Sequence, residues 1–412
     1  VFTRYSSLYY TPDPVGDLLF TGVAQTAARS VTSTGEQTDA SWKVSANHTL
    51  RAGFQVQVER GVSSTDSSVL PTDDTGAPLS DQPFNIHDGS GKTGSLYGLY
   101  LQDEWRILPN VTINYGARFD GVSEYDTETQ LSPRVNVVWR PTGTTTLHAG
   151  YSRTFTPPPF ELVAGSSVAL FNNTSAAAAV TQDSVVKAER DNYYDAGIDQ
   201  VLLPGLRVGV DGYYKQARNL IDEGQFGSPI ILSAFNYAKG QVSGLEFSSS
   251  YDRGPWSLYA NVAYSRAIGK DIDSAQFNFS ADELAYISQH YIHLDHDQRW
   301  TGSGGVAYTA FAQTTSPARL SADLLVGSGL RADYSSATGD VPNGRALPGY
   351  YTINLSAVQT LNIGYLHGTQ LRLDVLNVLD RKYDIRDGTG VGVGAPQFGL
   401  RRTVLAGLAQ RF

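Results

Sequence analysis

Apolar and polar side chains alternate, residue by residue, along much of this chain. Residues 111–120 read Val-Thr-Ile-Asn-Tyr-Gly-Ala-Arg-Phe-Asp, so the odd positions are apolar or aromatic and the even ones are polar or glycine. A period of two places these sets on opposite faces of a β-strand. Residues 370–375, Gln-Leu-Arg-Leu-Asp-Val, repeat the pattern. Such strands suit a wall between lipid and water, and they also suit a soluble β-sandwich that buries one face.

The connections between the predicted strands fall into two classes. Strands are expected at 1–10, 18–29 and 37–46, and the pattern continues to 401–412, for about 17 strands in all. Short turns rich in Pro, Gly, Asp or Asn alternate with long polar loops. The long loops are expected at about 61–93, 154–188, 219–237, 269–296, 332–348 and 381–399.

This sorting of connections by length favours a membrane barrel over a sandwich. Outer-membrane barrels have short turns at the periplasmic rim and long loops outside. We therefore predict an all-β, antiparallel transmembrane β-barrel with about 16–18 strands in this chain. Because bacterial single-chain barrels have an even number of strands, a count of 17 means that one strand is miscounted or that strands precede Val1. We expect that the chain alone is not a complete barrel.

Composition narrows the function. The chain has 412 residues, a net charge of −9 and no cysteine, which excludes disulfides and thiolate metal sites. It has no basic stripe, so nucleic acid is not an expected partner. No apolar run approaches the ~20 residues of a helical membrane span, as expected where only every second residue meets lipid. Many of the 24 tyrosines lie near predicted strand ends, where aromatic side chains form belts at the lipid surface.

Several segments, in this order, resemble the barrel of TonB-dependent outer-membrane receptors. They include Leu-Gln-Asp-Glu-Trp-Arg at 101–106, Gly-Tyr-Ser-Arg-Thr-Phe-Thr-Pro-Pro at 150–158, Leu-Asn-Val-Leu-Asp-Arg-Lys-Tyr at 376–383 and the terminal Phe412. The resemblance implies a 22-stranded barrel in the outer membrane of a Gram-negative bacterium, plugged by an N-terminal domain. It also implies TonB-driven uptake of a scarce ligand, with a ferric siderophore or similar metal chelate expected. Phe412 would be read by the barrel-assembly machinery. The chain departs from the family in showing neither a plug nor a TonB-contacting box.

Candidate ligand contacts lie in the predicted long loops, because loops on a rigid scaffold often carry binding sites. Packing among the loops themselves is the alternative for the aromatic residues. The His spacing of three and three suits a metal on a helix but not on a strand, and we expect this segment to contact ligand or another loop and to hold no structural metal. The candidates are Phe155, Phe160, Phe171, Phe226, Phe235, Tyr237, His290, His293 and His296.

Two sets of charged residues complete the candidates. An acidic first loop could hold calcium, but its spacing is not that of an EF-hand, and a solvated loop is the simpler interpretation. The acidic residues are Asp66, Asp73, Asp74, Asp81 and Asp88. The charged residues on the polar faces of the predicted strands are expected to face the lumen. They are Arg118, Asp120, Arg134, Arg153, Arg207 and Arg372.

The sequence offers no arrangement of nucleophile, histidine and carboxylate, so we predict neither an enzyme nor a cofactor. The leading function is ligand uptake across the outer membrane. The alternatives are a passive pore, because no plug is found in this chain, and an adhesive or structural barrel whose loops bind a surface partner.

Overall fold

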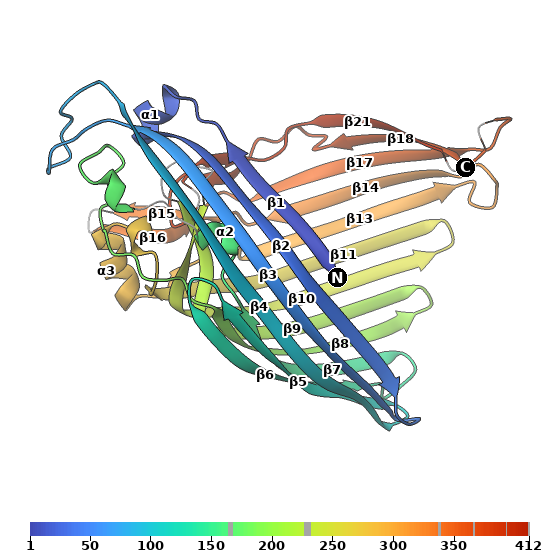
Figure 1. Cartoon of the computed structure of the whole chain (residues 1–412). Helices are drawn as coiled ribbons and strands as arrows, with labels where there is room; N and C mark the ends of the chain where they lie inside the picture. The colour runs from blue at the N-terminus through green and yellow to red at the C-terminus, as the bar shows by residue number, and fades with distance from the viewer. Residues whose placement is uncertain (164–167, 226–231, 337–338, 366, 393, 411–412) are drawn as a thin grey trace.

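The computed structural model covers residues 1–412 and describes all of them except 164–167, 226–231, 337–338, 366, 393 and 411–412. Its main feature is one long, curved antiparallel sheet in which each strand pairs with the next along the chain (Figure 1). The strands of this sheet are β1 (Phe2–Tyr10), β2 (Val23–Lys43), β3 (His48–Val69), β4 (Phe84–Leu108), β5 (Val111–Ser123), β6 (Thr127–Trp139), β7 (Thr145–Thr156), β8 (Glu189–Leu203), β9 (Leu206–Gln225), β10 (Leu232–Arg253), β11 (Trp256–Ile272), β12 (Ile292–His293), β13 (Trp300–Ala310), β14 (Ala318–Gly327), β17 (Tyr350–Leu361), β18 (Thr369–Leu376) and β21 (Thr403–Ala409).

Sixteen long strands make the wall. The sheet has 17 strands, but β12 has two residues and only adds to the edge of β11 before β13 takes over the pairing. Among the described residues, both the 17 strands of this sheet and its 16 long strands lie within the predicted range of about 16–18. Residues 23–29 and 37–43 of the segments expected at 18–29 and 37–46 belong to the single strand β2, and residues 16–21 form the helix α1 (Gly16–Thr21). The polar stretch 30–36 carries no apolar alternation, so no pattern in the sequence indicates that the strand continues through it.

The two faces of the sheet differ in polarity, as the alternation predicts. In β3, Phe54, Val56 and Val58 are 40–48% exposed on one face. Residues 55, 57 and 59, which are Gln, Gln and Glu, lie on the other face. The short helix α2 (Phe160–Val163) contacts β2, β3 and β10, so it lies inside the curve, on the polar face. The apolar face is the outer surface that would meet lipid.

The long connections gather at one end of the sheet (Figure 1). We call this the loop end and the opposite end the turn end. The expected loops contain ordered elements that the sequence analysis did not predict. Besides α2 they are η1 (Val168–Phe171), η2 (Gln276–Asn278), α3 (Ala281–Gln289), β15 (Arg331–Ser336), β16 (Gly339–Ala346), β19 (Asp384–Asp387) and β20 (Pro396–Phe398).

Some strands are longer than predicted. Residues 61–69 and 84–93, expected as loop, belong to β3 and β4, so only 70–83 connect these strands. In the same way β9 extends to Gln225 and β10 begins at Leu232, within the expected loop 219–237. Crossing a membrane takes ~9–11 residues of a tilted strand, and β3 has 22. The surplus projects beyond lipid, where water on both faces removes the apolar–polar alternation that identifies a strand.

The loop end has its own hydrophobic core. Buried side chains from the ends of β9, β10 and β11 pack with η2, α3 and β12. Phe235 lies edge-on against both Tyr237 and Phe279, with ring centroids 5.1 and 4.9 Å apart. Helix α3 begins with a capping box in which Ser280 accepts from the Glu283 backbone N–H and Glu283 accepts in return. This core holds the loops in fixed positions over the inner face.

Among the described residues the sheet does not close on itself. Strand β1 pairs only with β2, and β21 pairs only with β18. Because the 16 long strands alternate in direction, β1 and β21 run antiparallel to each other. The expectation of an incomplete barrel rested on an odd strand count together with the lack of a plug. The long strands are even in number, and the unpaired edges of β1 and β21 are what the structure shows.

Within the part of the chain that the structure describes, no helix has the length and apolar character needed to cross a membrane.

Candidate functional site

The sheet carries two hollows of different charge. The first, of about 420 Å³, is lined by Arg118, Asp120, Arg134, Arg153 and Phe155, among others, and we call it the arginine hollow. It lies between β4, β5, β6 and β7. The charged residues that line it are three arginines and one aspartate, so an anionic ligand would be favoured there.

The arginines of this hollow are held in place by neighbours on adjacent strands. Arg118 donates from Nε to Asp120 Oδ1 at 2.5 Å, two residues along β5. Arg134 donates to Gln102 and lies 5.9 Å above the ring of Tyr100. Arg118 and Arg134 share the inner face, because Gly116, the cross-strand partner of Arg134, is two residues from Arg118 in β5. Ser152 of β7 is the other partner of Arg134, so Arg153, which was predicted to face the lumen, and Phe155 alternate to the opposite face at the edge of this hollow.

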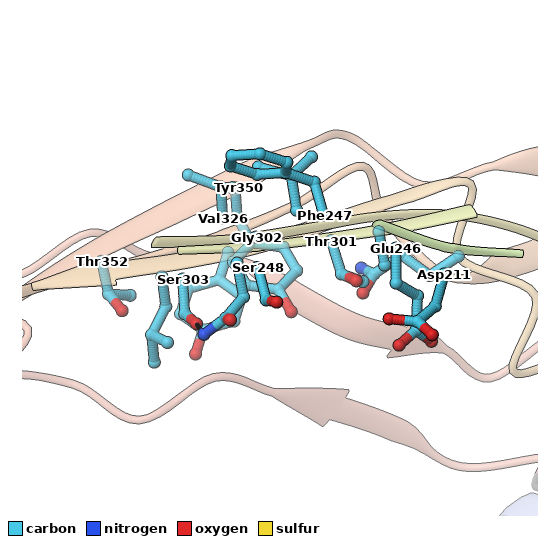
Figure 2. A pocket seen from close by; sticks show the side chains of 16 residues that line it. Asp211, Glu246, Phe247, Ser248, Thr301, Gly302, Ser303, Val326, Tyr350 and Thr352 are labelled. Carbon is cyan, nitrogen blue, oxygen red and sulfur yellow. Dashed lines mark hydrogen bonds between the residues drawn. The ribbon is translucent and has the colours of Figure 1, made fainter. Parts of the chain in front are cut away.

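The second hollow, of about 520 Å³, is acidic (Figure 2). Asp211 of β9 and Glu246 of β10 are direct cross-strand partners, and Figure 2 shows their carboxylates side by side. Hydroxyl and amide groups continue the lining, and none of the residues that line it is Lys or Arg. Asp211 also lies 2.9 Å from His148 Nε2, an approach that Gly197 permits because a Cβ there would lie 2.0 Å from Asp211 Oδ1. This hollow would favour a cationic group, and the sequence analysis did not single it out.

The two other predicted lumen arginines lie outside both hollows. Arg207 of β9 is the cross-strand partner of Ser250, next to the turn end. Arg372 of β18 donates to Asp374 at 2.6 Å, and both side chains are on the same face of that strand.

The predicted aromatic contacts are mostly buried. Phe171, Phe235 and Tyr237 have 0–1% of their surface exposed and Phe160 has 3%, so their rings pack within the loop end. Phe155 remains partly exposed in the arginine hollow, with the Arg190 guanidinium 5.4 Å from its ring centroid. Phe226 and Phe412 lie outside the described residues.

The three histidines are not brought together. His290 stacks on Tyr286, with ring centroids 4.4 Å apart. His293 Nδ1 lies 2.9 Å from Asp297. His296 Nδ1 lies 2.5 Å from Asp295 Oδ1, and this carboxylate raises the pKa of His296 above its ordinary value.

The acidic residues of the first predicted loop are also dispersed. Asp66 lies in β3 beside His87, 2.8 Å away, whereas Asp88 lies in β4. Asp73 accepts hydrogen bonds from Thr75 and from the backbone N–H of Ala77 within its own turn. The structure thus gives this loop no shared carboxylate site among these residues.

The sequence analysis named His293 and His296 but not the two charged clusters at the loop end to which they belong. In one, the fully buried Asp297 carboxylate accepts two hydrogen bonds from Arg331, at 2.9 and 2.6 Å, and one from the Ala267 N–H. The other, which we call the loop junction, joins Asp222, Asp295, His296 and Arg386. Its members come from β9, the β11–β13 loop and β19, so no spacing along the sequence could have indicated it.

Comparison with known proteins identifies the architecture. The family described as "TonB dependent receptor-like, beta-barrel" matches residues 2–378. No curated protein matches the chain.

Solved structures of low sequence identity share the fold. The ferric yersiniabactin uptake receptor FyuA from Yersinia pestis is 13% identical, with a TM-score of 0.67 over 98% of this chain and 57% of that one. The FrpB iron transporter from Neisseria meningitidis is 14% identical, with a TM-score of 0.63 over 98% of this chain and 60% of that one. The ferric citrate transporter FecA is 17% identical, with a TM-score of 0.61 over 98% and 56%. This chain thus spans between half and two thirds of the length of these structures.

Proposed function

The chain belongs to the TonB-dependent receptor-like β-barrel family, and we propose that it forms the barrel wall of a receptor that takes up a ferric siderophore or a similar metal chelate with energy supplied through TonB. The family consists of receptors and transporters of the Gram-negative outer membrane rather than enzymes. Uptake receptors for ferric yersiniabactin and ferric citrate are among the structures that share this fold.

The observation that supports this ligand class is the arginine hollow. Ferric chelates built from carboxylates, catecholates or hydroxamates often carry negative charge and flat unsaturated groups. Arg118 and Arg134 would pair with the anionic oxygens, and Phe155 offers an apolar ring beside them. Their positions on rigid paired strands preorganise the hollow.

Uptake measurements on the intact receptor test this proposal. In cells that lack other receptors, radiolabelled iron is supplied as a panel of ferric chelates under iron limitation. We expect the double variant Arg118→Ala/Arg134→Ala to need at least ~10-fold more chelate for half-maximal uptake, because each charge-assisted hydrogen bond is worth about 1.5–3 kcal/mol. Arg372→Ala, on the same inner face but outside the hollow, is the matched control. Equal uptake by both variants would contradict the assignment of the hollow.

Dependence on TonB separates active uptake from a passive pore. We expect uptake to stop when TonB is deleted or the proton gradient is collapsed. Continued uptake under either condition, together with ion conductance in planar bilayers, would instead support a porin. Surface binding of the chelate without any uptake would support a barrel that only adheres.

A further inference from the structure

Three potential metal ligands converge at the loop junction. One donor atom from each of Asp222, Asp295 and His296 lies within 4.8 Å of the other two. Asp222 is on β9, whereas Asp295 and His296 follow β12, so a strand of the wall and a folded loop each supply part of the set. The loop-end core fixes both elements, which means that the donors are held together before any ion arrives.

Asp295 has an oxygen that is available to an ion. The residue is 6% exposed, and among the described residues its Oδ1 has no partner in hydrogen-bond geometry. His296 Nδ1 is 2.5 Å from this oxygen, but the direction of its N–H bond does not meet the geometry of a hydrogen bond. A buried carboxylate oxygen without a hydrogen bond is costly, so an additional cation near it would be stabilised. His296 is 66% exposed in its side chain, which gives the site a route to solvent.

The separations suit a small divalent ion after a minor adjustment. Oxygen and imidazole ligands lie about 2.0–2.2 Å from a first-row divalent metal, so two ligands on opposite sides of one ion are at most ~4.4 Å apart. The observed upper limit of 4.8 Å therefore requires the donor atoms to move closer by at least ~0.4 Å, which a side-chain rotation supplies. Two carboxylates with one imidazole form a mixed oxygen and nitrogen set that suits first-row transition metals.

Arg386 of β19 already contacts two of these three residues, Asp295 and His296. Its Nη1 donates to Asp295 Oδ2 at 2.5 Å, and its Nη2 lies 2.8 Å from His296 Nε2. When His296 Nε2 accepts a hydrogen bond from Arg386, the proton of the neutral imidazole must be on Nδ1. Neither ring nitrogen then has a lone pair that is free to bind a metal ion. A bound metal takes one ring nitrogen and leaves the proton on the other. Metal binding and the Arg386–His296 contact therefore exclude each other.

We propose that Asp222, Asp295 and His296 form an exchangeable site for a first-row divalent transition-metal ion, and that Arg386 is the internal cation with which the ion competes. With Arg386 in place the isolated protein holds no tightly bound metal, in agreement with the expectation that the His290–His296 segment carries no structural ion. Binding of an ion releases Arg386 and with it the β18–β21 loop, which lies against the site at Gly392, where a Cβ would be 2.6 Å from Asp295 Oδ2.

Metal titration of the whole purified chain in detergent tests the proposal. Zn²⁺ and Co²⁺ are added as simple salts, heat is followed by calorimetry, and Co²⁺ coordination is followed by its visible absorption. We expect one site per chain. Asp295→Asn or His296→Ala should weaken binding at least ~10-fold, whereas Arg386→Gln should tighten it by a similar factor. Loss of the folded site would lower the affinity of this one site, whereas Arg386→Gln is expected to raise it at an unchanged stoichiometry of one ion per chain, so this variant keeps the test valid even if another variant is unstable.

His290→Ala is the matched control, because His290 is on the same segment, exposed and outside the junction. The proposal predicts unchanged metal affinity for this variant. It also predicts that Zn²⁺ increases protease cleavage within 377–402 in the original chain but not in Asp295→Asn. The proposal is overturned if Arg386→Gln binds no tighter than the original chain, or if His290→Ala lowers the affinity as much as His296→Ala. These outcomes are independent of whether the receptor transports a chelate.

Discussion

Buried charges at the loop end give the sharpest single-residue predictions. Asp297 is fully buried and accepts two hydrogen bonds from Arg331, whose side chain is only 10% exposed. We expect Asp297→Asn to leave Arg331 without its counter-charge and to destabilise the loop end by about 3 kcal/mol. Hydrogen exchange should show lost protection in 269–299 and 328–349. Asp374→Asn, which breaks an ion pair on β18 whose Arg372 side chain is 61% exposed, should leave these segments unchanged.

Because of Asp333 in β15, we expect the stability of the β15–β16 hairpin to depend on pH. Burial, with further contributions from Glu283 and Asp340, raises the pKa of Asp333 above its ordinary value of 3.8. The folded hairpin therefore prefers the protonated carboxyl, so this contribution to stability is complete below about pH 4 and is lost as the pH rises through the raised pKa.

Protection factors for 331–346, corrected for intrinsic exchange, should fall as the pH rises above about 4. In Asp333→Asn this slope should disappear, while the backbone N–H of Asn343 can still donate to the side-chain oxygen. A hairpin whose protection rises with pH would show that the sign is wrong.

Neighbouring residues of a strand lie on opposite faces of the wall, so the same substitution should cost different amounts of folding free energy at the two positions. Phe247 of β10 is 42% exposed on the outer face, and Ser248 lies in the acidic hollow beside Glu246. Both are far enough from the turn at 254–255 to lie near the bilayer centre. Phe247→Arg should cost ~2–4 kcal/mol of folding free energy in lipid vesicles. Ser248→Arg should cost much less because it meets carboxylates and water; equal costs would refute the assignment of the faces.

Helix α3 depends on its first turn. Ser280 caps it by accepting from the Glu283 N–H at 3.2 Å, and Ile287 anchors it in the loop-end core. We expect Ser280→Ala to destabilise this helix by about 1 kcal/mol, measured as faster hydrogen exchange in 281–289. Ser288→Ala, near the exposed end of the same helix, is the control and should change exchange little.

The open edges lead to a prediction about the whole sheet. Unpaired N–H and C=O groups in lipid cost several kcal/mol each, so a few of them exceed the ~5–15 kcal/mol that stabilises a typical domain. We therefore expect other strands to cover β1 and β21 in the membrane, and their number to be even because these two edges run antiparallel.

Cross-linking tests this prediction cleanly, because the chain has no cysteine of its own. Ser7→Cys with Ala406→Cys places one thiol in the middle of each edge strand, and we expect no disulfide in the membrane-inserted receptor. Leu371→Cys with Leu408→Cys is the positive control, since these residues are cross-strand partners in β18 and β21. Efficient oxidation of the first pair would show that this chain closes its barrel alone.

The sequence by itself determined the wall of this protein. Alternation with a period of two is local, and lipid on one side and water on the other impose it on every crossing strand, so the faces of β3 and β5 could be assigned without a structure. Arg118, Asp120 and Arg134 were identified as inner-face candidates for the same reason. The Ser280–Glu283 capping box was also a readable signal, although it was not used.

Only the tertiary structure decided the loop end. Residues beyond the lipid have water on both faces, so their strands lose the alternation, and the extent of β3, β4, β9 and β10 was underestimated. The arginine hollow, the acidic hollow and the loop junction each combine side chains from several strands or loops. Asp222 and Arg386 meet Asp295 because the curvature of the sheet and the packing of the loop-end core bring them together. Contacts between such distant segments leave no periodic trace along the chain.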